Sequence, residues 1–147
     1  AGTPPYPHRM HPDFRCAYGE MAFVNIPLSV DFSSPGSSKQ YFCYEDLRPS
    51  GRKSDPRELL RNIVEKTKAD NPAYPIIHMI THNDQPFDDP LHESRQRLEE
   101  AVGSVQSVCE EVGYSPISAT IEDVVNSILA EPAEQAKSWD QDNDVYF

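Results

Sequence analysis

The sequence predicts a small α+β protein, in which a three- or four-stranded sheet is packed by three helices and extended arms lie at both ends. Short runs rich in β-forming residues occur between residues 21 and 44, and three amphipathic stretches occupy residues 55–130. The chain has 147 residues, of which 37% are hydrophobic, and this is enough for one modest core. We therefore expect an extended arm over residues 1–20, a compact domain over 21–131 and an acidic tail over 132–147.

Proline marks the N-terminal arm. Four prolines fall within its first twelve residues, at Pro4, Pro5, Pro7 and Pro12. Because proline fixes φ and removes a backbone donor, this composition favours an extended, polyproline-like chain.

Two short strands are expected next. Apolar residues alternate with polar ones at Leu28, Val30 and Phe32. This period of two predicts a strand within residues 21–32, and Pro27 makes it an edge or bulged strand. A Ser/Pro/Gly turn over 33–38 leads to a second strand over 40–44, and together they predict a hairpin.

The clearest helix is predicted over residues 55–69. Ser54 or Asp55 can cap it and Pro56 suits its first turn. An apolar stripe at helical spacing follows, formed by Leu59, Leu60, Ile63 and Val64. The next apolar run, over residues 74–81, is short and bounded by polar residues, which favours a buried strand.

Two further helices are expected. One runs from about residue 89 to 112 and ends at Gly113, the residue type preferred just after a helix. The other begins after Thr120, where Asp123 completes a capping box. The apolar face of the first comprises Leu91, Leu98, Val102, Val105, Val108, Cys109 and Val112. That of the second comprises Ile121, Val124, Val125, Ile128 and Leu129.

Charge and cysteine content exclude several classes of protein. Thirteen basic against 24 acidic residues give a net charge of -11, which argues against a nucleic-acid partner. No apolar run approaches the roughly 20 residues that a membrane-spanning helix needs. Cys16, Cys43 and Cys109 form no C-x-x-C motif, and three free thiols suit a reducing compartment. A secreted binding domain with a Cys16–Cys43 disulfide is the alternative.

Two sets of residues contain metal-ligating types. The first is His78, His82, Asp84, Asp88, Asp89, His92 and Glu93, and the second is His8, His11, Cys16 and Cys43. Neither set has the spacing of a known metal site. For the first set, a solvated loop with acids that cap the next helix is the favoured interpretation. For the second, histidines of the arm at an interface and buried cysteines are favoured. No nucleophile stands in a recognisable catalytic setting. We therefore predict no catalytic residue, no metal and no cofactor.

The segment 74–129 resembles the second half of a Ras-like GTPase. In that family, an apolar strand ends in Asn/Thr-Lys-x-Asp, and a Ser-Ala loop precedes the last helix. Here the strand ends in Thr81-His82-Asn83-Asp84, and Ser118-Ala119 precedes the last helix.

The resemblance implies that Asp84 faces the edge of a guanine base and that Ala119 lies against the base. His82 stands in place of the family's lysine, and the chain has no phosphate loop. The resemblance therefore implies a non-catalytic, degenerate half, a small nucleotide- or metal-binding domain centred on residues 78–93.

Both ends of the chain carry residues suited to a protein interface. These are Tyr6, Met10, Phe14, Trp139, Val145, Tyr146 and Phe147. Ordering each residue costs about 1–2 kcal/mol of backbone entropy, and binding to another protein would offset that cost. We therefore expect a non-catalytic accessory or structural subunit of a larger assembly, whose partners are other protein subunits.

The acidic charge would complement basic partner surfaces, because residues 121–147 hold seven acidic residues and one lysine. The chain begins at Ala1 rather than Met, so either the numbering was trimmed or a presequence was removed. The second alternative suits an organellar subunit. This favours a mitochondrial subunit, for example one at the periphery of a respiratory complex.

Overall fold

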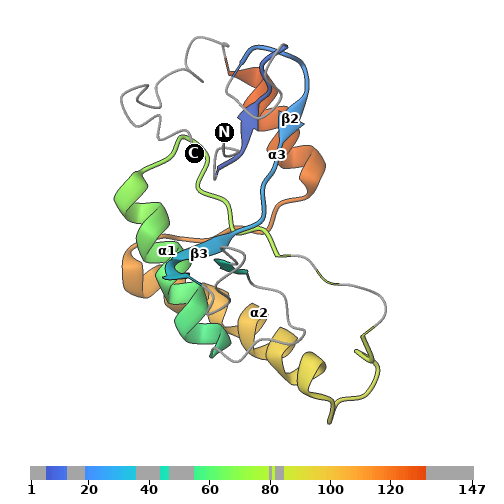
Figure 1. Ribbon diagram of the computed structural model, residues 1–147. Helices are drawn as coiled ribbons and strands as arrows, with labels where there is room; N and C mark the ends of the chain where they lie inside the picture. Colours follow the sequence, from blue (N-terminus) through green and yellow to red (C-terminus); the bar gives the residue numbers. More distant parts are fainter. Residues whose placement is uncertain are drawn as a thin grey trace. The chain divides into compact units, whose positions relative to one another are not determined.

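A computed structural model describes most of the chain, and the described residues form four short strands and three helices (Figure 1). The fold is therefore mixed α+β, as predicted. The described residues are 6–12, 19–35, 44–46, 55–79, 81 and 85–131. The chain divides into two compact units, the first formed by Ala1–Pro27, Asn71–Ile76 and Ile117–Phe147, and the second by Leu28–Asp70 and Ile77–Pro116.

In the second unit, helix α1 (Pro56–Asp70) confirms the helix predicted over 55–69. Asp55 caps it, because its Oδ1 accepts the backbone N–H groups of Arg57 at 2.8 Å and Glu58 at 3.0 Å. These two donors have no partner within the helix, so the cap supplies what the first turn lacks.

Helix α2 (Glu93–Val112) begins later than the predicted residue 89. The preceding residues form turns instead, in which the N–H of Asp89 bonds to the carbonyl of Pro86 and the Asp89 side chain accepts the N–H of Leu91. The helix then begins after His92, whose Nδ1 accepts the N–H of Ser94 at 3.2 Å. Short-range hydrogen bonds of Asp89 therefore compete successfully with helix formation.

The end of α2 follows the prediction. Gly113 has φ of 96°, a left-handed conformation that glycine adopts without steric cost. Its N–H bonds to the carbonyl of Glu110 at 3.0 Å, and the N–H of Tyr114 bonds to that of Cys109 at 2.8 Å. This is a Schellman motif, which satisfies carbonyls that the helix leaves unpaired.

The core of the second unit lies between α1 and the C-terminal half of α2. Its buried members are Leu59, Leu60, Ile63, Val64, Val108 and Cys109. Partly buried residues pack around them, namely Ile77, Met79, Val105, Val112 and Tyr114. The predicted apolar stripe of α1 is therefore buried as expected.

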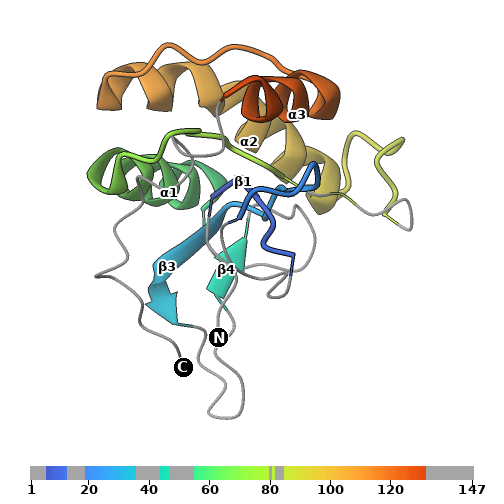
Figure 2. The same ribbon diagram turned by 90° about the horizontal axis from the view of Figure 1, so that it is seen from above.

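A hairpin forms next to α1, but its first strand lies later than predicted, because residues 33–35, which were expected in the turn, belong to the strand. Strand β3 (Val30–Pro35) pairs antiparallel with β4 (Tyr44–Asp46), as Figure 2 shows. Val30 lies opposite Asp46, and the register shifts between Asp31 and Pro35. The second strand thus begins at Tyr44, where the prediction ended, and residues 40–43 lie outside the described part.

The strand predicted over residues 74–81 is wrong for its described residues, 74–79 and 81, none of which belongs to a strand. One backbone hydrogen bond joins this segment to the start of β3, from the N–H of Ser29 to the carbonyl of His78 at 3.0 Å. The N–H of His78 donates to the Ser29 hydroxyl at 2.8 Å. A side chain therefore takes the place of a backbone acceptor, and the β-ladder does not continue.

In the first unit, β1 (His8–Arg9) pairs antiparallel with β2 (Val24–Asn25). Both strands are short, and Met10 extends the pairing by donating its N–H to the carbonyl of Phe23 at 2.9 Å. Gly19 passes so close to the backbone of His11 that a Cβ there would lie 2.2 Å from the His11 Cα. Only glycine fits at this approach.

Helix α3 (Ile121–Ala130) completes the first unit and contacts both β1 and β2. Its predicted capping box is confirmed, because the Asp123 N–H donates to Thr120 Oγ1 at 3.1 Å and the Thr120 N–H donates to Asp123 Oδ2 at 2.8 Å. At the other end, the Arg9 guanidinium donates to the carbonyls of Leu129 at 2.6 Å and Glu131 at 2.9 Å. Arg9 thus supplies the positive charge that the last turn of α3 itself lacks.

The described strands form two separate two-stranded sheets, β1–β2 and β3–β4. A single three- or four-stranded sheet is therefore not confirmed among these residues. Residues 8 and 9 of the predicted arm belong to a strand, whereas residues 132–147 lie outside the described part. The division into arm, domain and tail stays a prediction.

Candidate functional site

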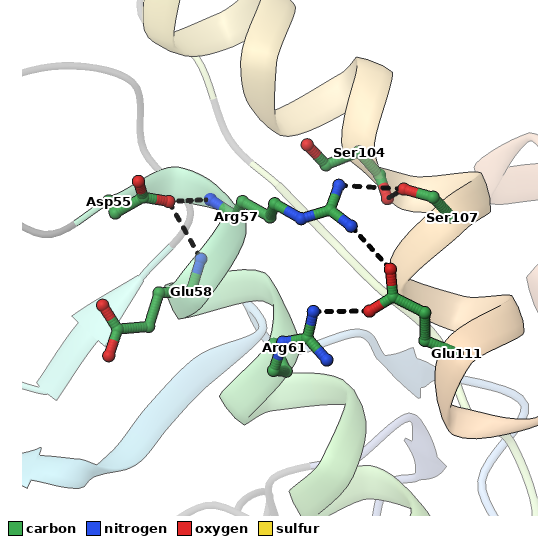
Figure 3. Close-up of polar contacts among 7 residues, drawn as sticks. All are labelled: Asp55, Arg57, Glu58, Arg61, Ser104, Ser107 and Glu111. Atoms are coloured by element: carbon green, nitrogen blue, oxygen red, sulfur yellow. Dashed lines mark hydrogen bonds and ion pairs between the residues drawn. The ribbon is translucent and has the colours of Figure 1, made fainter.

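The most connected group of polar side chains joins α1 to α2 (Figure 3). Arg57 donates to Ser107 Oγ at 3.0 Å and to Glu111 Oε1 at 2.6 Å. Arg61 binds the other carboxylate oxygen of Glu111, so one glutamate holds two arginines. The three charged side chains are about 40% exposed, and such ion pairs contribute roughly 0–1 kcal/mol each.

This cluster positions the two helices above the core. Both oxygens of Glu111 are already engaged by arginines, so the carboxylate is not free to act as a base. The Ser107 hydroxyl accepts from Arg57 and donates to the carbonyl of Ser104 at 3.2 Å. The arrangement is that of a helix–helix joint, and it offers no activated nucleophile.

A buried histidine lies in the first unit. The His8 side chain is only 2% exposed, and its Nδ1 donates to the carbonyl of Tyr6 at 2.8 Å. Burial lowers the pKa of the imidazole below 6.5, and the hydrogen bond to Tyr6 opposes this effect only in part. His8 is therefore neutral at pH 7 and serves the packing of this unit.

The predicted metal-ligating residues are only partly described. His82 and Asp84 of the first set lie outside the described residues, as do Cys16 and Cys43 of the second. Among the residues that the structure describes, no three His, Cys, Asp or Glu side chains gather closely enough to hold a metal ion. Cys109 is a buried, unbridged core residue, and burial raises the pKa of its thiol.

The residues predicted for a protein interface also fall into two groups. Tyr6 is buried and Met10 is half-buried in the first unit. The others lie outside the described part of the chain, namely Phe14, Trp139, Val145, Tyr146 and Phe147. Their role in binding another protein stays a prediction.

Sequence reasoning missed a set of exposed apolar side chains. It placed Leu91, Val102 and Ile121 on helix faces that a core would cover, yet they are 82%, 55% and 67% exposed. Phe23 and Ile117 are exposed as well. Leu91 precedes α2, and Val102 follows Ala101, which is only 5% exposed, so these two residues lie before and at the edge of the buried face of α2.

The exposed residues continue stripes that are buried further along. The α2 stripe, which we define as Leu91, Leu98, Val102, Val105, Val108, Cys109 and Val112, is buried at Val108 and Cys109. The α3 stripe, defined as Ile121, Val124, Val125, Ile128 and Leu129, is buried at Ile128. The buried face of α2 runs from Ser94 to Cys109, with exposed Val102 at its edge and exposed Leu91 before the helix begins. On α3, Ile128 near the C-terminal end is buried and Ile121 at the N-terminal end is exposed.

Comparison with known protein families, curated proteins and solved structures finds no match for this chain. Among the described helices, none is both long enough and apolar enough to span a bilayer.

Proposed function

We propose that this protein is a non-catalytic accessory subunit of a larger protein assembly, which it joins through its small α+β body and its two ends. The observation that supports this function is the exposure of large apolar side chains beside buried helix faces. Isolated exposed apolar residues are normal on protein surfaces, but Val102 and Ile121 adjoin buried faces of α2 and α3, and Leu91 lies just before α2.

Covering these residues would provide a driving force for association. Full burial of a leucine or isoleucine side chain contributes about 1.5–3 kcal/mol, and valine contributes toward the lower end of that range. Three such side chains would supply roughly 5–8 kcal/mol before the entropic cost of association is subtracted. This magnitude suits a subunit that depends on several contacts, including its ends, rather than one tight interface.

The native size of the protein tests this function. The tagged full-length chain is expressed in the cells that produce it, and the extract is fractionated by size under native conditions. We expect the chain to elute with particles far larger than its own 16.6 kDa. Elution at the size of a monomer would contradict the proposed function.

A variant of the α2 stripe adds specificity to this test. Leu91→Asp/Val102→Asp should release the chain from the assembly, because charges would replace the exposed apolar groups. Gln96→Glu/Ser115→Asp adds the same charge at two exposed polar positions and should leave the assembly intact. Circular dichroism of both purified variants verifies that the helices remain.

The sequence also predicts a second function, a nucleotide- or metal-binding domain centred on residues 78–93. Calorimetric titration of the full chain distinguishes the two functions. Under the accessory-subunit proposal, guanine nucleotides and Zn²⁺ give no saturable heat. Saturable binding at micromolar concentration would favour the second function instead.

A further inference from the structure

The N-terminal end of α3 combines exposed apolar groups with negative charge. We define the α3 surface as Ile117, Ile121, Val125 and Glu122. Ile117 is 87% exposed and Ile121 is 67% exposed, while Val125 is half-buried one turn after Ile121. Residues four apart on a helix are neighbours, so Ile121 and Val125 form a continuous apolar ridge.

Carboxylates are the only charged side chains on this helix. Glu122 and Asp123 lie in its first turn, and no lysine or arginine lies anywhere on α3. Glu122 is one position from Ile121 and three from Val125, so it lies beside the ridge. Asp123 lies on the opposite side of the helix, where it caps the first turn through Thr120. The surface therefore presents apolar groups beside the carboxylate of Glu122, on a chain whose net charge is -11.

This combination favours one kind of occupant. A second copy that docked through the same surface would place its own Glu122 close to that of the first, and like charges in a contact oppose binding. An anionic membrane surface would repel the same carboxylate. A partner that carries both apolar and basic side chains meets neither obstacle.

We propose that the α3 surface binds a basic amphipathic helix of a partner protein. The apolar side chains of that helix would cover Ile117, Ile121 and Val125, and its lysine or arginine residues would pair with Glu122. This inference rests on the proposed function and names the chemistry of one partner. A helix is a suitable occupant because the ridge from Ile121 to Val125 follows an i, i+4 row, along which helices pack on one another.

The test uses a defined probe and the full-length chain. The probe is a fluorescent 18-residue helical peptide with leucine at every third or fourth position and lysine between, and the charge control replaces each lysine with glutamate. We expect saturable binding of the basic peptide in fluorescence anisotropy, weaker at 200 mM than at 50 mM NaCl. The acidic peptide should not bind, and equal binding of both peptides would overturn the proposal.

Paired variants locate the binding site. Ile121→Ala should weaken binding about tenfold through lost apolar contact, whereas Val102→Ala, a similar truncation at an exposed position of α2, should not. Glu122→Gln should weaken binding severalfold and reduce its salt dependence, whereas Glu93→Gln, in the first turn of α2, should not. Equal effects within each pair would show non-specific attraction of the peptide to an acidic protein and would overturn the proposal.

Other occupants give distinct results. Sedimentation of the chain with vesicles that contain phosphatidylserine would identify a membrane as the occupant and overturn the proposal. A dimer that Ile121→Ala disrupts would identify a second copy as the occupant and would also overturn it. Failure of this inference also differs from failure of the proposed function. In the first case the wild-type chain still elutes with a large assembly, but neither Ile121→Ala nor Glu122→Gln changes peptide binding.

Discussion

Truncating Leu60 to alanine should strongly destabilise the second unit. The Leu60 side chain is 1% exposed and belongs to the core between α1 and α2. Removing a buried leucine to alanine costs about 2–5 kcal/mol, which combines the lost transfer free energy with the cavity that remains. Because small domains are stable by only about 5–15 kcal/mol, this is a large fraction of the total.

Leu91→Ala is a matched control for this substitution. It removes the same atoms from a side chain that is 82% exposed, so we expect a loss of less than about 0.5 kcal/mol. The two variants therefore differ only in how fully the leucine is buried. The comparison tests the position of the core directly.

Urea unfolding followed by far-ultraviolet circular dichroism measures both effects. With a denaturant slope of about 1.5 kcal/mol per molar urea, a loss of about 3 kcal/mol lowers the midpoint by about 2 M. Amide exchange in α1 and α2 should accelerate in parallel in the Leu60 variant. Equal midpoints for the two variants, or a larger effect of Leu91→Ala, would refute the described core.

Two glycines should respond to alanine in opposite directions, and urea unfolding measures both effects. Gly103→Ala, inside α2 with open space around its Cα, should stabilise the fold by about 0.5–1 kcal/mol. Gly113→Ala, at φ of 96°, should destabilise it by about 1 kcal/mol. Burial lowers the pKa of His8 in the folded protein, so the unfolded chain binds a proton at this residue more readily as the pH falls below 6.5. The free energy of unfolding should therefore decrease with falling pH in this range, and His8→Asn should make that decrease smaller. An unchanged pH dependence in this variant would contradict the assignment. Thr120→Ala removes the cap of α3 and should cost about 1 kcal/mol, seen as faster amide exchange confined to that helix, whereas Ser118→Ala, two residues earlier, should have no such effect.

Local sequence signals predicted the helix ends well. Asp55 before α1, the Thr120–Asp123 box before α3 and Gly113 after α2 all act over a few residues, so their chemistry is visible without knowledge of the fold. The start of α2 was misplaced because the turns around Asp89 depend on competing short-range bonds that periodicity does not report.

Features that depend on distant neighbours were harder to predict. The apolar run from residue 74 has the composition of a strand, yet the N–H of His78 bonds to the hydroxyl of Ser29 rather than to a backbone carbonyl. The exposure of Ile121 was missed for a similar reason. Periodicity shows which side of a helix is apolar, but the length of the covering element decides how much of that side is buried.

The hydrogen bonds from Arg9 to the end of α3 constrain how the newly synthesised chain can fold. Arg9 and Leu129 are separated by 120 residues, so at about 5–20 residues per second a ribosome adds the second some 6–24 s after the first. The second unit is fully synthesised at Pro116, whereas the first needs both early and late segments. We therefore expect the second unit to fold during synthesis, while the β1–β2 pair waits for its helix until residues 121–130 have been synthesised.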